Sequence, residues 1–421
     1  MAAGRILWSR RPVGSNGWTS GGVSGSPTLT AWFWQGATAP GAGPVARDSR
    51  VDIFRGLALL IIFVDHVAGN WLSRVTPSAM GLSDAAEYFV LLAGYSAAFA
   101  YGTAIDRRGL VAGSAQVVAR IWRLYTAHLG LFIFMAAAVA LMALKVGNPL
   151  YYEHVAILPF FQDTANSILA MAVLLFLPNY LDILPLYIVL LAMLPLLWVM
   201  VRVAPALALA ASVTLYGAAW YLELAIPNLP TGGVWFFNPF AWQLIFTVGL
   251  LAGHAALNGV GLGRSRLVLV LALAVVAAGL VNAAPWAFIP GLEGLALPDL
   301  WRLDPDKTNL SPWRLAHALA LACLVIRLVP VDAAWMRSRW ARLIDDCGRQ
   351  SLPLFCLGVI LSLVGTFVFF EIGRGPLMQI LVNVVGLALL LGAGRVLQWY
   401  KMAAVKTPAR GPAVLSEVRF R

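Results

Sequence analysis

The stretch DSRVDIFRGLALLIIFVDHVAGNW (Asp48–Trp71) has the length and apolar character of a membrane-spanning helix. A helix needs about 20 predominantly apolar residues to cross the hydrocarbon core of a bilayer. Yet Asp52, Arg55, Asp65 and His66 all lie within this stretch. Ionisable groups inside a span are energetically costly and usually mark a functional site or an ion pathway. A hydrogen bond between helices is the simpler alternative, but so many ionisable groups in one span favour a function.

The composition of the whole chain predicts an all-α polytopic membrane protein. Of 421 residues, 60% are hydrophobic and only 12% are charged, and the mean hydropathy is +0.80. A soluble domain carries about a quarter charged residues. A transmembrane β-barrel would show short alternating segments, which this sequence lacks.

Ten apolar runs predict ten transmembrane helices. They cover residues 52–73, 84–104, 118–144, 184–203, 206–225, 239–257, 267–284, 313–331, 351–370 and 376–399. A further run at 167–177 is too short to cross and predicts a re-entrant or interfacial helix. Residues 1–46 are expected to form a disordered cytoplasmic tail, 47–400 the ten-helix domain, and 401–421 a basic cytoplasmic tail.

The basic residues support this topology. With ten spans, both termini and most basic residues face the cytoplasm, as the positive-inside rule requires. These residues include Arg50, Arg107, Arg108, Arg120, Arg202, Arg266, Arg337, Arg339, Arg342, Arg349 and Lys401. A crossing at 167–177 would divide them between the two sides. The net charge of +11 is therefore attributed to membrane orientation rather than to nucleic-acid binding.

Four segments are expected outside the cytoplasm: 146–183, 226–238, 285–312 and 371–375. Their aromatic and hydrogen-bonding residues include Tyr151, Tyr152, Tyr180, Asp182, Trp235, Asn238, Trp301, Asp306 and Asn309. Aromatic faces beside carboxylates and amides suit sugar rings. An aromatic belt at the membrane interface is the alternative.

Arg55 and His66 lie eleven positions apart. On a helix they face nearly the same way, about 16 Å apart along the axis. The topology puts Arg55 near the inner surface and His66 in the outer half. Histidine is well suited to take a proton from an alcohol near neutral pH. Asp52 lies one turn before Arg55 and can pair with it.

The third span begins with RIWRLYTAHLG, which puts Arg120 and Arg123 at the inner surface, one turn apart. Two arginines there can clamp phosphates or simply fix the topology. The histidines show no spacing typical of a metal site, and no bound metal is expected.

Several motifs resemble the OpgC family of osmoregulated periplasmic glucan succinyltransferases. They are RVDIFRGLALLIIFVDH, EYFVLLAGYS, ARIWRLYTAHL, LPNYLDILPLY, FNPFAWQLIF, DKTNLSPWRLAHALAL and CGRQSLPLFCLG. The resemblance covers about residues 50–400. More distantly, the pair Arg55 and His66 looks like the Arg-x10-His signature of the type 3 membrane acyltransferases. In an element of that superfamily, Ala93 stands here where serine is usual.

The resemblance implies transfer of succinyl from cytoplasmic succinyl-CoA to a glucose hydroxyl of a periplasmic β-glucan. It also implies a location in the bacterial inner membrane and no permanently bound cofactor. His66 would remove the hydroxyl proton, or carry the acyl group itself in a two-step transfer. Asp65 or Asp182 would orient the imidazole or a sugar hydroxyl.

The donor is expected to need cationic partners. The expected contacts of the CoA phosphates are Arg120, Arg123, Arg107 and Arg108. The free carboxylate of succinyl also needs a cation or hydrogen-bond donors, and Arg55, Lys307 and Arg314 are the candidates. Asp52, beside Arg55, is grouped with the substrate-binding residues.

Two other functions remain open from the sequence. An O-acetyltransferase acting on another cell-envelope glycan would carry the same signature. A proton-coupled transporter would also bury Asp, Arg and His, although transporters often show internal repeats and none is evident here. The sequence leaves the oligomeric state open.

Overall fold

The structure is a computed structural model and describes residues 34–35, 48–263, 265–286, 291–298, 301–303 and 305–406. The expected N-terminal tail lies outside these residues, except for β1 (Trp34–Gln35), which pairs antiparallel with β4 (Gly261–Leu262). The last helix continues to Lys406, so the segment expected as a C-terminal tail begins as helix. The remainder of that segment lies outside the described residues.

A helix occupies each of the ten predicted spans. These helices are α2 (Ser49–His66), α4 (Ala85–Ala97) continued by η2 (Ala98–Gly102) and α5 (Thr103–Arg108), α6 (Leu110–Val146), α10 (Ile183–Val203), α11 (Pro205–Tyr221), α12 (Pro239–Leu257), α13 (Arg266–Ala283), α14 (Pro312–Leu328), α16 (Ser351–Glu371) and α17 (Pro376–Lys406). Within the described part of the chain, seven are long and apolar enough to cross a membrane. The protein is therefore a multi-pass membrane protein.

The remaining three helices, α2, α11 and α14, leave the count of ten a prediction. Helices α11 and α14 have 17 residues each, just short of a full span. Helix α2 carries Asp52, Arg55 and Asp65 within its length.

Short elements connect the long helices. They are η1 (Trp71–Val75), α3 (Pro77–Met80), α7 (Leu150–His154), α8 (Leu158–Gln162), α9 (Thr164–Ala172), β2 (Pro227–Asn228), η3 (Leu229–Thr231), β3 (Gly233–Val234), η5 (Glu293–Leu295), η7 (Ala334–Arg337) and α15 (Arg339–Arg349). Helix α9, in the run at 167–177, has 9 residues. Its length of about 14 Å is less than half of a hydrocarbon core, so α9 is too short to cross.

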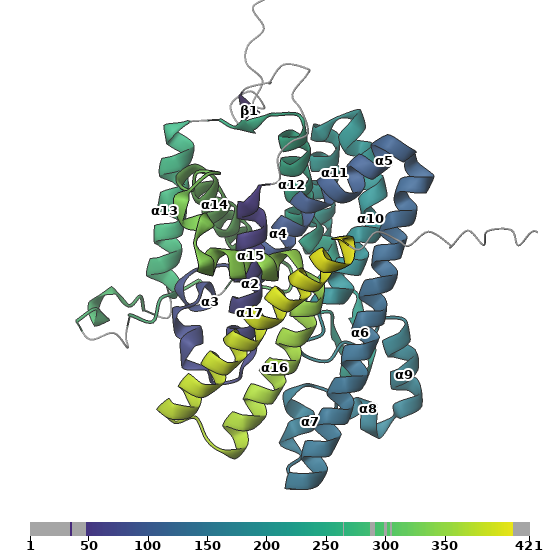
Figure 1. The fold of residues 1–421 in the computed structure, drawn as a ribbon, viewed down its shortest axis with the longest axis vertical. Coiled ribbons are helices and arrows are strands. Elements are labelled where there is room, and N and C mark those ends of the chain that lie inside the picture. Colours follow the sequence, from purple (N-terminus) through teal and green to yellow (C-terminus); the bar gives the residue numbers. More distant parts are fainter. Residues whose placement is uncertain are drawn as a thin grey trace, which may run out of the picture.

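The segments expected outside the cytoplasm lie together. Helices α7 to α9 and the turn between α16 and α17 are at one end of the molecule, opposite β1 and α5 (Figure 1). Two backbone hydrogen bonds join further outer loops. The Leu229 amide donates to the Leu175 carbonyl at 2.9 Å, and the Asn238 amide donates to the Thr308 carbonyl at 3.0 Å.

Helix α2 lies at the centre, where glycines allow close packing. A Cβ added at Gly56 would collide with the Ile344 carbonyl of α15, and one added at Gly348 would collide with the Asp52 carbonyl. Small residues let helix backbones approach closely in this way. The Asp48 side chain caps the start of α2 by accepting from the Arg50 amide at 3.0 Å. Arg55 and His66 are therefore carried on one helix that packs firmly against its neighbours.

Candidate functional site

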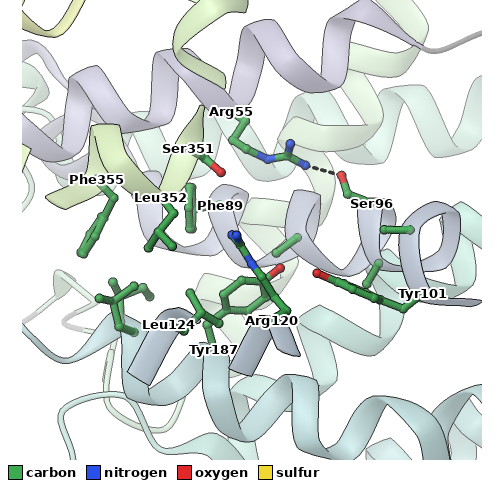
Figure 2. A pocket seen from close by; sticks show the side chains of 15 residues that line it. Arg55, Phe89, Ser96, Tyr101, Arg120, Leu124, Tyr187, Ser351, Leu352 and Phe355 are labelled. Carbon is green, nitrogen blue, oxygen red and sulfur yellow. Dashed lines mark hydrogen bonds between the residues drawn. The ribbon is translucent and has the colours of Figure 1, made fainter. Parts of the chain in front are cut away.

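A partly open cavity of about 130 Å³ lies beside Arg55. Helices α2, α4, α6, α10 and α16 and the π-helical turn η2 contribute its walls. The lining residues are Arg55, Phe89, Ala93, Ser96, Ala97, Ala100, Tyr101, Arg120, Leu124, Ile183, Leu184, Tyr187, Ser351, Leu352 and Phe355. Arg55 and Arg120 extend toward it from different helices (Figure 2). The cavity thus combines two guanidinium groups, several hydroxyls and an apolar wall, which suits an amphipathic anion.

Arg55 is fixed by contacts to two helices. Its Nη2 donates to the Leu92 carbonyl at 3.1 Å and to the Ser96 hydroxyl. Its Nη1 lies 3.4 Å from Asp52, a carboxylate that is only 1% exposed. Ser96 lies one turn after Ala93, so a nearby serine does contact the arginine although Ala93 has no hydroxyl.

The four arginines expected near the CoA phosphates differ in their position relative to the cavity. Arg120 lines the cavity. Arg123 is exposed, and its Nε donates to the Ala119 carbonyl of its own helix at 3.3 Å. Arg107 and Arg108 are exposed at the end of α5. Of these four, Arg120 alone reaches the described cavity.

His66 ends α2, and its ring is held in a defined orientation. Its Nδ1 lies 2.7 Å from the Ile62 carbonyl oxygen. A carbonyl only accepts, so Nδ1 carries the proton and donates, and the neutral ring keeps Nε2 as an acceptor. The ring centroid lies 5.4 Å from that of Tyr180. His66 is therefore arranged as a base through Nε2.

Asp65 or Asp182 was expected to orient the imidazole of His66 or a sugar hydroxyl, and the hydrogen-bond partner of His66 Nδ1 among the described residues is the Ile62 carbonyl. Asp65 accepts a hydrogen bond from the Thr76 hydroxyl at 2.6 Å, while the Ile62 carbonyl takes the orienting position on the imidazole. Asp182 directly precedes α10. Burial raises the pKa of the Asp182 carboxyl to about 7, and the nearby Lys307 ammonium partly counteracts this rise.

Four charged residues form an outer charge cluster, defined here as Asp84, Glu87, Lys307 and Arg314. Lys307 Nζ and Arg314 Nη2 contact the same Asp84 oxygen at 2.6 and 2.9 Å. Arg314 Nε also contacts Glu87 at 2.6 Å, and Glu87 is 0% exposed. Burial raises the pKa of the Asp84 carboxyl, but Lys307 and Arg314 outweigh burial and hold it well below its usual range.

Lys307 connects this cluster to His66. Its ammonium acts electrostatically on His66, Asp65 and Asp182. The ammonium also lies over the rings of Phe236 and Phe237, 5.5 and 5.6 Å from their centroids. The outer end of α2 is thus surrounded by both acidic and basic groups.

Several residues expected to bind glycan are instead interior. Tyr151 is buried and donates to Glu371. Trp235 is 2% exposed. Asn238, also buried, donates to Asn309 at 2.9 Å. The hydrogen bonds of Tyr151 and Asn238 join the outer loops, whereas the buried Trp235 Nε1 has no hydrogen-bond partner among the described residues.

The other expected glycan residues are more accessible. Trp301 is 69% exposed. Asp306 is exposed and accepts from Asn309 at 2.8 Å. Tyr152 packs edge-on against Phe161, with ring centroids 4.8 Å apart. Asp52 lies beside Arg55, far along α2 from these loops.

Sequence reasoning missed Asp84, Glu87 and the contact between His154 and Tyr180, although Tyr180 itself was expected at the site. A signal existed for the first two, because an acidic residue followed three positions later by Glu before an apolar run is a capping box, and Asp84 and Glu87 form one. His154 donates to or accepts from the Tyr180 hydroxyl at 2.7 Å. No spacing in the sequence indicates that contact.

The comparisons with known proteins give one match. The chain matches the family described as OpgC protein over residues 47–402. No curated protein and no solved structure matches the chain. The matched range contains the long helices, except the last four residues of α17, together with the cavity, His66 and the outer charge cluster.

Proposed function

The chain belongs to the OpgC protein family, which implies a membrane acyltransferase, and from that premise we propose that it transfers succinyl from succinyl-CoA to periplasmic β-glucan. The donor would enter from the cytoplasm and the glucan from the opposite side. Transfer between two compartments requires a site within the membrane that both substrates reach.

One observation carries this proposal. A single helix, α2, holds Arg55 beside a cavity and His66 at its outer end, with Nδ1 of His66 bonded to Ile62 and Nε2 left to accept. The two residues are separated by a rise of about 16 Å. A pantetheine arm is of comparable length, so a CoA bound near Arg55 would present its thioester near His66.

The inner end of the site is proposed to bind CoA. Arg55 and Arg120 share the cavity wall with hydroxyl and apolar groups, a combination that suits both the amides and the anionic groups of CoA. Arg123, Arg107 and Arg108 are exposed, so they would act on the phosphates only from the surface.

The chemistry is proposed to be direct transfer with His66 as general base. A glucose hydroxyl attacks the thioester carbonyl carbon while His66 Nε2 takes the hydroxyl proton. The tetrahedral intermediate then collapses, the carbon–sulfur bond breaks, and His66 returns the proton to the departing CoA thiolate. General base catalysis of this kind contributes about 10²- to 10⁴-fold.

Lys307 is the best candidate for binding the free carboxylate of succinyl. Arg314 is held by both Asp84 and Glu87, and Arg55 lies at the other end of α2. Among the residues that the structure describes, Lys307 has one carboxylate partner, Asp84, which it shares with Arg314, and its side chain is 28% exposed. Its ammonium also acts electrostatically on His66. A residue that binds the succinyl carboxylate has to lie near His66, because the acyl group reacts there.

The test measures transfer of label from radioactive succinyl-CoA to β-glucan by purified protein. We expect labelled glucan from native protein and a loss of about 10²- to 10⁴-fold in His66→Ala. His254→Ala is the matched control, because His254 packs against Trp198 and Asn258 near the end of α12 and should retain activity.

The same assay distinguishes the alternatives. Transfer of label from acetyl-CoA but not from succinyl-CoA would mean that acetyl-CoA is the donor, and the acyltransferase function would stand. Full activity in folded His66→Ala would contradict the mechanism. If the native protein transferred label from neither succinyl-CoA nor acetyl-CoA, the proposed acyltransferase function would be contradicted.

A further inference from the structure

Tyr180 has a backbone conformation that residues other than glycine rarely adopt. Its φ is 75°, in the left-handed region that bulky residues disfavour. Such conformations persist where the surroundings enforce them, and they cluster at functional sites. Here Asn179 enforces it, donating from its backbone to the Val155 carbonyl at 3.0 Å and from its side chain to the His154 carbonyl at 3.0 Å.

The same turn brings the Tyr180 side chain between two histidines. Its hydroxyl lies 2.7 Å from His154 Nε2, and its ring lies beside the ring of His66. The Thr366 hydroxyl lies close enough to Tyr180 to lower its pKa, although burial outweighs this effect. The Thr366 oxygen accepts from the Ala68 amide at 3.0 Å, which fixes the Thr366 side chain on this side of the site.

The protonation states fit a Tyr180 hydroxyl that accepts a hydrogen bond from His154. Burial raises the pKa of Tyr180 to about 12, so the phenol keeps its proton at any working pH. Burial and the nearby Arg374 lower the pKa of His154, so its imidazole is neutral. In the tautomer that carries its one proton on Nε2, His154 donates to the Tyr180 oxygen at 2.7 Å. The Tyr180 proton is then free to point elsewhere.

We propose that Tyr180 donates a hydrogen bond to the oxyanion formed during acyl transfer, and that His154 positions it. The role rests on the acyl transfer proposed above. When the sugar hydroxyl oxygen bonds to the thioester carbon, the carbonyl π electrons move onto the carbonyl oxygen. The Tyr180 O–H stabilises that negative charge until the carbonyl re-forms and the thiolate leaves. His66 transfers the proton throughout, and Tyr180 keeps its own.

Tyr180→Phe removes only the hydroxyl and keeps the ring against His66. Loss of one oxyanion donor lowers kcat by about 10²- to 10³-fold in known enzymes, and we expect a loss of about 10²-fold here. The KM for the acyl donor should change little, because the bond forms only after the carbonyl has been attacked. Tyr125→Phe is the matched control. The Tyr125 hydroxyl donates to the Ala172 carbonyl at 2.7 Å, a contact that does not involve His66.

His154→Gln tests the positioning role. We expect a smaller loss of kcat, about tenfold, at unchanged donor KM. The variant that combines His154→Gln with Tyr180→Phe should lose no more than Tyr180→Phe alone, because His154 acts through the hydroxyl that is already gone. A purely structural role would instead lower the unfolding temperature and add to the effect of Tyr180→Phe.

The outcomes separate this role from the function on which it rests. Active native protein with a Tyr180→Phe variant within twofold of native kcat would overturn the oxyanion role and leave the acyltransferase intact. Losses that multiply in the double variant would overturn the positioning role of His154. Native protein inactive with both succinyl-CoA and acetyl-CoA would overturn the acyl transfer, and this role with it.

Discussion

At the scale of single residues, Arg314 joins the two carboxylates at the start of α4. It contacts Asp84 at 2.9 Å and Glu87 at 2.6 Å, and its side chain is 11% exposed. Removing one partner from a buried ion pair leaves an uncompensated charge, whereas replacing both partners by apolar groups is often nearly neutral. Each charged group of the cluster is therefore stabilised in the folded protein only while its partners are present.

We predict that Arg314→Met lowers the free energy of unfolding by about 3–5 kcal/mol. Glu87 would then be buried without its cation. Adding Glu87→Leu to Arg314→Met should recover part of the loss, because the orphaned carboxylate is removed as well. Thermal unfolding of the purified protein in detergent measures both. A double variant less stable than Arg314→Met alone would contradict the pairing.

Asp182 makes stability depend on pH. Its folded-state pKa is about 7, above the value of about 3.9 for an unfolded chain. Between these two pH values the folded protein therefore binds more protons than the unfolded chain. The contribution of Asp182 to the free energy of unfolding falls as the pH rises through this range. Asp182→Asn, which mimics the protonated acid, should be more stable than native protein at pH above about 7 and similar near pH 4. Unfolding temperatures across this range measure the difference, and a difference independent of pH would contradict the raised pKa.

The sequence predicted the residues of α2 better than those around it. Arg55 and His66 stood out because ionisable groups are rare in an apolar span. The grouping of Arg120 with Arg123 was less informative, since only Arg120 lines the cavity. Which face of α6 meets the cavity depends on its packing against α10 and α16, and the sequence of α6 alone does not determine that rotation.

At the scale of elements, glycines set the distance between α4 and α12. A Cβ added at Gly94 would collide with the Phe246 carbonyl, and one added at Gly249 would collide with the Leu91 carbonyl. The two glycines thus act reciprocally, each admitting the backbone of the other helix. Helix α4 also carries the cavity residues Ala93 and Ser96, so this packing determines the shape of the cavity.

We predict that Gly94→Ala destabilises the protein by about 1–3 kcal/mol, as overpacking a well-packed interface does. Gly217→Ala is the control: Gly217 is also helical, in α11, and an added Cβ there meets nothing within 4 Å. That substitution should be neutral or stabilising by up to about 1 kcal/mol, because alanine favours helix. Equal unfolding temperatures for the two variants would contradict the close approach.

The apolar runs predicted the helices well because a lipid-exposed helix needs a long apolar surface. Their ends were predicted less well. Helix α6 begins at Leu110, before the expected 118, since Gly109 with φ of 82° separates it from α5. The short helices α7 and α8 were not predicted at all, because five residues carry too little periodicity to stand out.

At the scale of the whole molecule, the expected topology puts α7 to α9 outside and the turn between α10 and α11 inside. We predict that an impermeant thiol reagent labels Glu153→Cys on intact cells. Val111→Cys and Val203→Cys should react only after the membrane is opened. All three residues are exposed, and native protein controls for its own cysteines.

Because Glu153 and Val203 flank both α9 and α10, the pair also tests whether α9 crosses. Labelling of Val203→Cys on intact cells would mean two crossings between them and would contradict the ten-helix topology. Labelling of Val111→Cys but not of Glu153→Cys would reverse the orientation.

The unbroken course of α2 has a consequence for which donors the protein can use. A helix advances by a constant rise of about 1.5 Å per residue, and α2 runs without interruption from Ser49 to His66. The distance along the helix axis between Arg55 and His66 is therefore fixed. Under the proposed mechanism, a carrier held at Arg55 would deliver its acyl group to His66 only if its arm matched that distance. Short activated acyl compounds would be rejected by length alone, whatever their reactivity, and inserting one residue between the two positions would turn His66 away by about 100°.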